Sequence, residues 1–347
     1  MQLCFNRNGA QRLHFGGAAA LYSSYPRIRN GQMVRNPQEN LEDAGQQLGR
    51  GVHNLQQDDR QTVPEGDQRS YSKREVLLRG LQQKVIDLSC CPLNDACKTR
   101  NYMTSRYWFK RENDPDYLIA CDTAMLEMSH WTTADYFDHH NNTKATFEVT
   151  RTESNKYYDL QTSIEVLEML LNHQGQRNGF QVKTFLQDLL DVIDKVRPKC
   201  NTFMIIGPRE SGKSYLIDCI STYYLNIGHM SNPSKQNNFP FNMCVNKRVL
   251  CWNEPAYPPV FEETLKKICG GDPESINVKN KNSVYMARTG LLITTNEEVL
   301  KDPIFNQRII KYYFQTCSKL KEYTKYPTPL AWQYLIKKYE LKLVSNE

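Results

Sequence analysis

The sequence lacks any long apolar run. Of its 347 residues, 24% are charged and 39% are hydrophobic, and the hydrophobic residues fall in short clusters. A membrane-spanning helix needs about 18 or more consecutive apolar residues, and no segment approaches that length. The N-terminus also lacks the apolar core of a secretory signal. We therefore expect a soluble intracellular protein that has no membrane partner.

The cysteines lack a disulfide framework. There are 11 of them, an odd number at irregular spacing, and Cys219, Cys251 and Cys269 fall in segments that we expect to be buried. This usage is typical of reduced, packed thiols in an intracellular protein. A zinc site is the alternative, but the spacing matches no pattern that such sites use. Its candidate ligands are Cys90, Cys91, Cys97, Cys121 and His130.

The first part of the chain lacks acidic residues. No Asp or Glu precedes Glu39, while several arginines do. Residues 1–72 are rich in Gln, Asn, Arg and Gly and have few apolar clusters, which is the composition of a disordered tail. A basic arm that contacts nucleic acid and a mitochondrial transit peptide are the alternatives. The net charge of +6 is compatible with a polyanionic partner without indicating one.

Two helical regions follow this tail. Residues 73–158 begin with an apolar stripe at helical spacing and continue with many aromatic residues, which predicts a small mixed region of unknown role. Residues 159–199 contain two apolar stripes separated by a glycine-containing break, which predicts a pair of helices. The second stripe runs from Phe185 to Val196, and Pro198 ends the helix.

A phosphate-binding motif comes next. An apolar run at residues 203–206 is typical of a buried strand, and a helical pattern follows residue 214. The segment between them matches G-x-x-x-x-G-K-[ST], whose glycines let backbone N–H groups converge on phosphate oxygens at the positive end of a helix. The lysine can reach the β and γ phosphates, and the last hydroxyl can bind Mg²⁺. The motif consists of Gly207, Pro208, Arg209, Glu210, Ser211, Gly212, Lys213 and Ser214.

Residues 200–330 alternate strands with helices and loops, which predicts an α/β fold with a parallel sheet covered on both faces. Ligands of such sheets gather at the carboxyl ends of the strands. Glu254 follows one strand, where it can orient or deprotonate the water that attacks the γ phosphate. Asn296 follows another and can hydrogen-bond the γ phosphate or that water. The expected strands lie at residues 203–206, 249–252, 291–294 and 309–314.

Two further segments carry positive charge. The alternation between Ile276 and Tyr285 predicts a β-hairpin whose tip carries Lys279 and Lys281. Two cations on a movable arm suit sequence-independent contact with a phosphate backbone, and a solvated turn is the alternative. Arg308 precedes the last strand, where an arginine can reach the nucleotide of a neighbouring subunit.

In their order and spacing, these motifs resemble the superfamily-3 helicase domain of parvovirus initiator (non-structural or Rep) proteins, those of densoviruses in particular. The likeness covers about residues 160–330, under half of the chain. The matching pieces are residues 207–214 for Walker A, Trp252-Asn253-Glu254-Pro255 for Walker B, Lys266 to Lys281 with Gly270-Gly271 for the B-prime motif, Thr294-Thr295-Asn296 for motif C, and Arg308 for the arginine finger.

The resemblance implies an AAA+ core at residues 200–330, preceded by an oligomerisation segment at 159–199 and followed by a C-terminal helix or tail at 331–347. It implies ATP hydrolysis with Mg²⁺ in a homo-oligomeric ring, usually a hexamer, that moves 3′ to 5′ on single-stranded DNA. The setting would be viral DNA replication in the host cell nucleus. The implied roles are catalysis for Lys213, Glu254, Asn296 and Arg308, nucleotide binding for Asn253 with the phosphate loop, metal binding for Ser214 and Glu254, and DNA binding for Lys266, Lys279 and Lys281.

The chain departs from the family pattern in two places. Many members carry two adjacent acids in Walker B, whereas the first position here is Asn253, which adds no negative charge toward Mg²⁺. The family's nicking nuclease uses a His-hydrophobic-His motif, and none precedes the phosphate loop, since His139 and His140 are adjacent. We therefore expect no nicking activity in this chain.

Two other functions share the phosphate-loop signal. One is a motor that packages or remodels nucleic acid without separating strands. The other is a non-catalytic, ATP-dependent DNA-binding or assembly module. Neither requires a basic hairpin coupled to an arginine across a subunit interface.

Overall fold

The computed structural model describes residues 28–29, 32–33, 72–143, 145, 147, 156–234, 236–237, 239–279 and 282–344. The chain divides into two units, Met1–Gln68 and Arg69–Glu347. In the first, β1 (Ile28–Arg29) pairs with β2 (Gln32–Met33) in an antiparallel ladder. Apart from Ser72, the rest of the predicted tail lies outside the described residues, so its disorder stays a prediction.

The second unit begins with a run of α-helices, and those that start before residue 181 begin at a capping side chain. The helices of this run are α1 (Lys73–Asp87), α2 (Arg100–Met103), α3 (Pro115–His130), α4 (Thr133–Asn142), α5 (Leu160–Asn178) and α6 (Val182–Ile193). Ser72 caps α1, and Glu75 accepts the Ser72 backbone N–H at 2.6 Å, which completes a capping box. Helix α5 begins at the cap Asp159 and ends at Gly179, whose φ of 73° suits glycine.

The end of α6 corrects one prediction. The helix stops at Ile193, so Val196 lies outside it and its side chain is exposed. The Val196 N–H donates to the Asp191 carbonyl at 2.8 Å and the Lys195 N–H to Val192 at 3.2 Å, with Lys195 at a φ of 58°. These bonds form a Schellman cap, which usually carries glycine at the position that Lys195 occupies. Without a glycine as signal, the apolar stripe suggested too long a helix.

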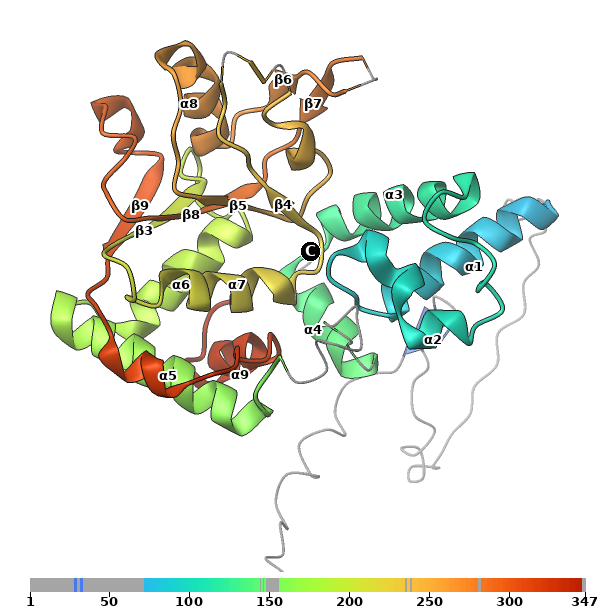
Figure 1. Ribbon diagram of the computed structural model, residues 1–347, viewed down its shortest axis with the longest axis horizontal. Helices are drawn as coiled ribbons and strands as arrows, with labels where there is room; N and C mark the ends of the chain where they lie inside the picture. Colours follow the sequence, from blue (N-terminus) through green and yellow to red (C-terminus); the bar gives the residue numbers. More distant parts are fainter. Residues whose placement is uncertain are drawn as a thin grey trace, which may run out of the picture. The chain divides into compact units, whose positions relative to one another are not determined.

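A five-stranded parallel sheet forms the centre of the second unit (Figure 1). Its order is β4 (Ile227–His229), β5 (Val249–Asn253), β8 (Gly290–Thr295), β3 (Thr202–Ile206) and β9 (Ile309–Tyr313). The predicted α/β class and its parallel sheet are confirmed, and the predicted strands agree with the observed ones to within about a residue. The exception is β4, a short edge strand around Gly228 that the sequence pattern did not reveal.

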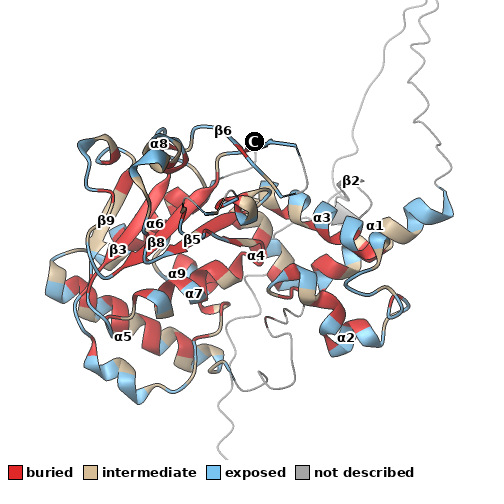
Figure 2. Ribbon diagram, turned by 45° about the horizontal axis from the view of Figure 1, so that its top comes forward, coloured by how far each residue is buried: buried red, intermediate tan, exposed pale blue. Residues whose placement is uncertain are grey.

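Side chains that alternate along β3 divide the core into two layers. Phe203 and Ile205 pack with the apolar faces of α6 and α7 (Lys213–Tyr223), and α9 (Ala331–Lys338) belongs to the same cluster. Met204 and Ile206 pack on the opposite face with α8 (Glu262–Gly270). That layer also holds the hairpin of β6 (Glu274–Ile276) and β7 (Val284–Met286). Figure 2 shows β3 and β8 as buried strands between these layers.

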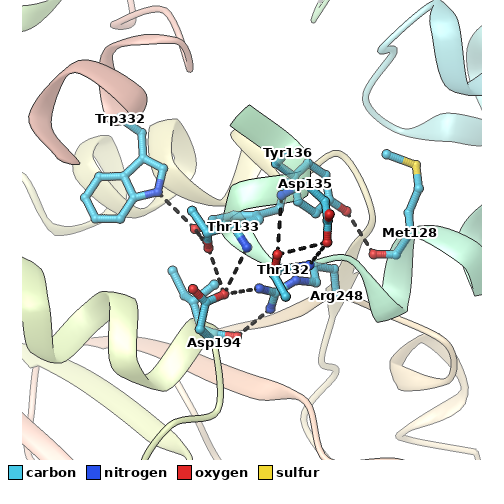
Figure 3. Close-up of polar contacts among 10 residues, drawn as sticks. Met128, Thr132, Thr133, Asp135, Tyr136, Asp194, Arg248 and Trp332 are labelled. Atoms are coloured by element: carbon cyan, nitrogen blue, oxygen red, sulfur yellow. Dashed lines mark hydrogen bonds and ion pairs between the residues drawn. The ribbon is translucent and has the colours of Figure 1, made fainter. Parts of the chain in front are cut away.

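A buried ion pair joins the preceding helices to the sheet (Figure 3). The Arg248 guanidinium, just before β5, contacts the Asp194 carboxylate just after α6, and their side chains are 1% and 2% exposed. Asp194 also accepts the Thr133 hydroxyl of α4 at 2.7 Å. The Trp332 indole N–H of α9 donates to the Tyr224 hydroxyl at 3.0 Å. Removing either ion would leave the other buried and uncompensated, so this junction depends on both partners.

The described residues hold neither a metal-binding cluster nor a membrane-spanning helix. Among the described residues, no group of His, Cys, Asp and Glu side chains is arranged to hold a metal ion, so the zinc alternative has no basis there. Burial raises the pKa of the Cys121 thiol to about 12, which keeps this cysteine protonated. None of the helices in the described part of the chain has the length and apolar character needed to cross a membrane.

Candidate functional site

The phosphate loop joins the carboxyl end of β3 to the start of α7. The Gly207 N–H donates to the Thr295 carbonyl at 3.0 Å and so extends the ladder between β3 and β8 by one bond. A Cβ on Gly207 would lie 2.3 Å from the Phe314 carbonyl oxygen, so only glycine fits there. Gly212 caps α7 at a φ of 87°, a conformation that glycine adopts without strain.

The backbone N–H groups of this loop are free to bind an anion. None of the N–H groups of residues 209–215 donates a hydrogen bond to another described residue. The first N–H groups of α7 are among them, as expected at a helix start, and the helix dipole adds positive potential. Residues 209–215 line a hollow of about 450 Å³ together with Asn253, Glu254, Asn296 and residues of the segment 317–321. Free amides around a hollow of this size form a phosphate-binding cradle.

Lys213 lies inside this cradle. Its side chain is 7% exposed, and its Nζ donates to the carbonyls of Gly207 at 2.7 Å and Pro208 at 3.0 Å. A weaker contact at 3.3 Å joins Nζ to the Asn296 side-chain oxygen. Burial lowers the pKa of Lys213, and the nearby Glu254 carboxylate opposes that shift. The ammonium group is thus held by neutral acceptors that a phosphate can replace.

Glu254 faces the cradle from the end of strand β5, which β8 separates from the strand β3 that carries the phosphate loop. Its backbone N–H donates to the Thr294 carbonyl at 2.9 Å, and its Oε2 accepts the Asn296 N–H at 3.1 Å. Its φ of 46° is unusual for a residue with a side chain. Strain of this kind needs support from surrounding contacts, and it concentrates at functional sites.

Asn232 supplies that support, and sequence reasoning missed it. Its amide nitrogen donates to the Glu254 carbonyl at 3.1 Å. Its amide oxygen accepts the Trp252 indole N–H at 2.7 Å and the Ala256 N–H at 3.1 Å. The three bonds span the turn that carries Glu254. No motif marks Asn232, because its position depends on the chain returning from β4 beside β5.

Asn253, the departure from the two-acid pattern, has a partner of its own. Its side-chain oxygen accepts the Thr294 hydroxyl at 2.8 Å, across the pair β5–β8. This bond engages the oxygen that a metal would use. The Ser214 hydroxyl and the Glu254 carboxylate are hard oxygen donors at the cradle, and they suit Mg²⁺ with phosphate oxygens and waters completing its shell.

The other predicted site residues lie away from the cradle. Arg308 precedes β9, and its carbonyl accepts the Thr202 N–H at the amino end of β3. The five residues of β3 separate this amino edge of the sheet from the phosphate loop, a distance of about 16 Å. Its guanidinium donates to the Ile304 carbonyl, packs beside Gly270, and leaves Nε without a partner among the described residues. Within one chain, Arg308 therefore cannot reach the cradle.

The predicted DNA-binding lysines lie on α8 and on the hairpin. Lys266 is paired with Glu263 at 3.4 Å, one turn earlier on α8. The hairpin prediction is confirmed by β6 and β7, with Ile276 opposite Val284. Lys279 is exposed beyond β6, and its backbone N–H donates to Asn242 at 3.3 Å. Lys281 lies outside the described residues.

A larger hollow of about 760 Å³ lies between α6 and residues 340–344. It is lined by side chains such as Gln187, Asp191 and Leu343. Neither the phosphate loop nor Lys213 is among its lining residues. Volume alone would favour it as a ligand site. The chemistry favours the smaller hollow at the carboxyl edge of the sheet.

Residues 176–308 match the family model of the parvovirus non-structural protein NS1. The initiator protein NS1 of Bombyx mori densovirus is 36% identical over 198 residues, which are 55% of this chain and 22% of that protein. The initiator protein NS1 of Diatraea saccharalis densovirus is 35% identical over 190 residues, 54% of this chain and 35% of that protein. The matches thus span between about a fifth and a third of the length of these relatives.

A crystal structure of JCV helicase with a bound small molecule is similar at a TM-score of 0.45 and 13% identity, over 75% of this chain and 82% of that chain. A likeness at this level carries no argument about activity. The sequence matches confirm the resemblance to parvovirus initiator proteins, and to those of densoviruses in particular, over the residues that they cover.

Proposed function

We propose that this chain carries the motor of an ATP-dependent DNA helicase that serves viral DNA replication. One observation supports this above all others. The free N–H groups of residues 209–215 surround a hollow into which Lys213 reaches and which Glu254 lines from the carboxyl end of β5. Such a site can hold a triphosphate and direct water at its γ phosphate.

The chemistry follows from the groups at the cradle. The loop amides bind the phosphate oxygens, and Lys213 exchanges the carbonyls of Gly207 and Pro208 for the β and γ phosphates. Glu254 orients the attacking water and accepts its proton, while the Asn296 amide contacts the γ phosphate or the same water. Mg²⁺ bound with Ser214 and Glu254 would neutralise phosphate charge.

ATP hydrolysis can drive movement along a DNA strand if two groups far from the cradle respond to the bound nucleotide. Arg308 cannot reach the cradle of its own chain, so we propose that it acts on the nucleotide of a neighbouring subunit in a homo-oligomeric ring, most simply a hexamer. The exposed Lys279, with Lys281 and Lys266, would contact the backbone of single-stranded DNA. The pair α5 and α6 would serve as the oligomerisation segment.

The finer points of the proposal come from the family resemblance alone. They are superfamily-3 membership, movement in the 3′ to 5′ direction and action in the host cell nucleus. The absence of nicking activity from this chain is proposed because no His-hydrophobic-His motif precedes the phosphate loop. Because the chain spans only part of its relatives' length, the activities of the whole relatives do not transfer to it without tests.

The test is an ATPase assay with and without single-stranded DNA, combined with unwinding of a forked duplex and a mass measurement of the assembly. The proposal expects DNA-stimulated hydrolysis, strand separation and a ring-sized mass. Stimulated hydrolysis without strand separation would favour a packaging or remodelling motor. ATP binding with no hydrolysis would favour the non-catalytic DNA-binding or assembly module.

A further inference from the structure

A buried amide outside the predicted site holds the phosphate loop from behind. Gln174 lies on α5 and is 0% exposed. Its side-chain nitrogen donates to the carbonyls of Ser211 at 2.9 Å and Gln315 at 2.7 Å. Its side-chain oxygen accepts the Gln315 N–H at 2.8 Å and the Asn178 side-chain N–H at 3.2 Å. Both donors and both acceptor sites of this amide are used, so its orientation is fully determined.

The hydrogen bond to the Ser211 carbonyl also orients the N–H of the next residue, Gly212. In a trans peptide, the carbonyl of one residue and the N–H of the next point in opposite directions. When the Ser211 carbonyl turns toward Gln174, the Gly212 N–H therefore turns away from it. Gly212 lines the hollow, and its N–H is one of those that donate to no other described residue. Gln174 thus holds this N–H free for a ligand.

Glycine makes such support necessary. Gly212 has no Cβ and sits at a φ of 87°, so its own conformational preference does little to fix the peptide before it. Packing restrains its position, since a Cβ here would lie 2.7 Å from methyl carbons of both Leu170 and Leu320. Packing of methyl groups sets a distance without setting the direction of a carbonyl. The hydrogen bond from Gln174 sets that direction.

The same amide holds the segment that covers the loop. Gln174 bonds both the N–H and the carbonyl of Gln315, just beyond β9. Two residues later, the Cys317 N–H donates to the Glu210 carbonyl at 3.0 Å. One side chain of α5 therefore ties together the phosphate loop and the chain that leaves the sheet beside it.

We propose that Gln174 is a positioning residue for nucleotide binding: it orients the peptide between Ser211 and Gly212 so that the Gly212 N–H meets a phosphate oxygen. This inference rests on the proposed function, because it needs a nucleotide in the cradle. Gln174 itself does not line the hollow, and it acts through the backbone.

Two variants separate positioning from plain structural support. Gln174→Leu removes the donors and leaves two buried carbonyls without them. Gln174→Glu keeps the shape and the acceptor for Gln315 but sets an oxygen against the carbonyls of Ser211 and Gln315. A buried carboxyl has a raised pKa, and once protonated it can donate again to one of these carbonyls.

The control is Gln333→Leu. Gln333 is 5% exposed on α9, where its amide donates to Asn141 at 2.8 Å and accepts the Tyr223 hydroxyl at 3.3 Å. It is a buried, hydrogen-bonded glutamine that touches no part of the phosphate loop. Gln333→Leu therefore shows how far the loss of a buried, hydrogen-bonded amide lowers stability when the phosphate loop is not affected.

The experiment is calorimetric titration of each full-chain variant with ATP and Mg²⁺, alongside its thermal unfolding midpoint. We expect Gln333→Leu to lower the midpoint and keep the affinity. Gln174→Leu should weaken ATP binding by about tenfold or more, the effect of misdirecting one phosphate donor. Gln174→Glu should bind weakly at pH 8 and recover toward the unmodified chain at pH 6, each pH being referenced to the unmodified chain.

Equal ATP affinity in folded Gln174→Leu and in the unmodified chain would overturn this inference and leave the proposed function standing. If Gln174→Leu does not fold, Gln174→Glu decides: an affinity deficit that does not change with pH would overturn the proposal, and a deficit that shrinks at low pH would support it. If the unmodified chain binds no ATP, the proposed function fails and this inference fails with it.

Discussion

The Glu254 side chain accepts a hydrogen bond from the backbone N–H of Asn296, 3.1 Å away, across the neighbouring strands β5 and β8. The bond engages Oε2, and among the described residues no partner holds Oε1. Oε2 therefore fixes the side chain to the backbone of β8, and Oε1 remains available to bind a water. The direction of the carboxylate toward the cradle is thus set before any nucleotide arrives, which reduces the reorganisation needed for catalysis.

Glu254→Gln tests the role of this acid. The amide oxygen can still accept the Asn296 N–H, so the turn and the cradle should keep their shape. ATP binding should stay within about twofold, while hydrolysis should fall by about 100-fold or more because the general base is lost. Titration with ATP and a phosphate-release assay measure the two effects. Normal turnover in this variant would remove Glu254 from its assigned role.

Asn232→Ala tests the support of the strained turn. The change removes the three hydrogen bonds that join Asn232 to Trp252, Glu254 and Ala256. We expect ATP affinity to hold and hydrolysis to fall by about tenfold, since a misplaced base costs rate more than binding. Asn142→Ala, which removes an exposed amide that donates to the Asp138 carbonyl, is the matched control. Equal rates for both variants would show that the turn holds without Asn232.

Arg308→Ala tests the action of one subunit on the next. The isolated variant should still bind ATP, since Arg308 lies at the opposite edge of the sheet from the cradle. In assemblies mixed with unmodified chain, ATPase activity should fall faster than the fraction of variant, because each altered subunit disables a neighbour's site. Arg100→Ala, which removes an exposed arginine on α2, is the control for the mixing of variant and unmodified chains. A linear decline would contradict action across the interface.

The double variant Lys279→Ala with Lys281→Ala tests the hairpin. Loss of two phosphate contacts should weaken single-stranded DNA binding and flatten its dependence on salt concentration by about 1.4 in logarithmic slope. Basal hydrolysis without DNA should persist, because Lys279 lies outside the cradle. DNA affinity measured over a salt series is the readout. Unchanged affinity and slope would leave the hairpin as a solvated turn.

Acid should destabilise the second unit through His140. Burial lowers the pKa of His140 to about 4. Its Nε2 donates to the Tyr223 carbonyl at 2.9 Å, and its buried Nδ1 has no partner among the described residues, so a second proton would be unsatisfied. The unfolded chain takes up this proton first as the pH falls through about 6.5, so stability is lost from there down to about pH 4. The total loss is on the order of 3 kcal/mol.

His140→Gln checks this assignment by chemical unfolding at several pH values. The glutamine keeps a donor for Tyr223 and does not titrate, so the fall in unfolding free energy between pH 7 and 5 should be smaller than in the unmodified chain. His139, whose pKa is also lowered by burial, accounts for part of what remains. An unchanged pH dependence would place the acid sensitivity elsewhere.

Much of the nucleotide site could be predicted because its signals are local. The strand before Gly207, the glycines of the loop and the helix after it follow from short-range backbone rules, and parallel strands bring their carboxyl ends to one edge. Glu254 and Asn296 come together there, as the sequence indicated.

The supports of the site could not be predicted in this way. Gln174 and Asn232 act through contacts with residues 37 and 22 positions away, and an isolated glutamine or asparagine carries no sequence signal. The Schellman cap after α6 uses Lys195 where glycine would have marked the helix end. Long-range partners and unusual φ angles emerge from packing, which a single sequence does not display.

The central claim is that the N–H groups around Gly212 and the ammonium of Lys213 bind a triphosphate, which Glu254 then helps to cleave. The most direct measurement is calorimetric titration of the purified chain and its Lys213→Ala variant with ATP and Mg²⁺. We predict saturable binding by the unmodified chain and at least about a 100-fold loss in the variant, since a charged contact to phosphate is removed. Folded, unmodified chain that takes up no ATP would contradict the account.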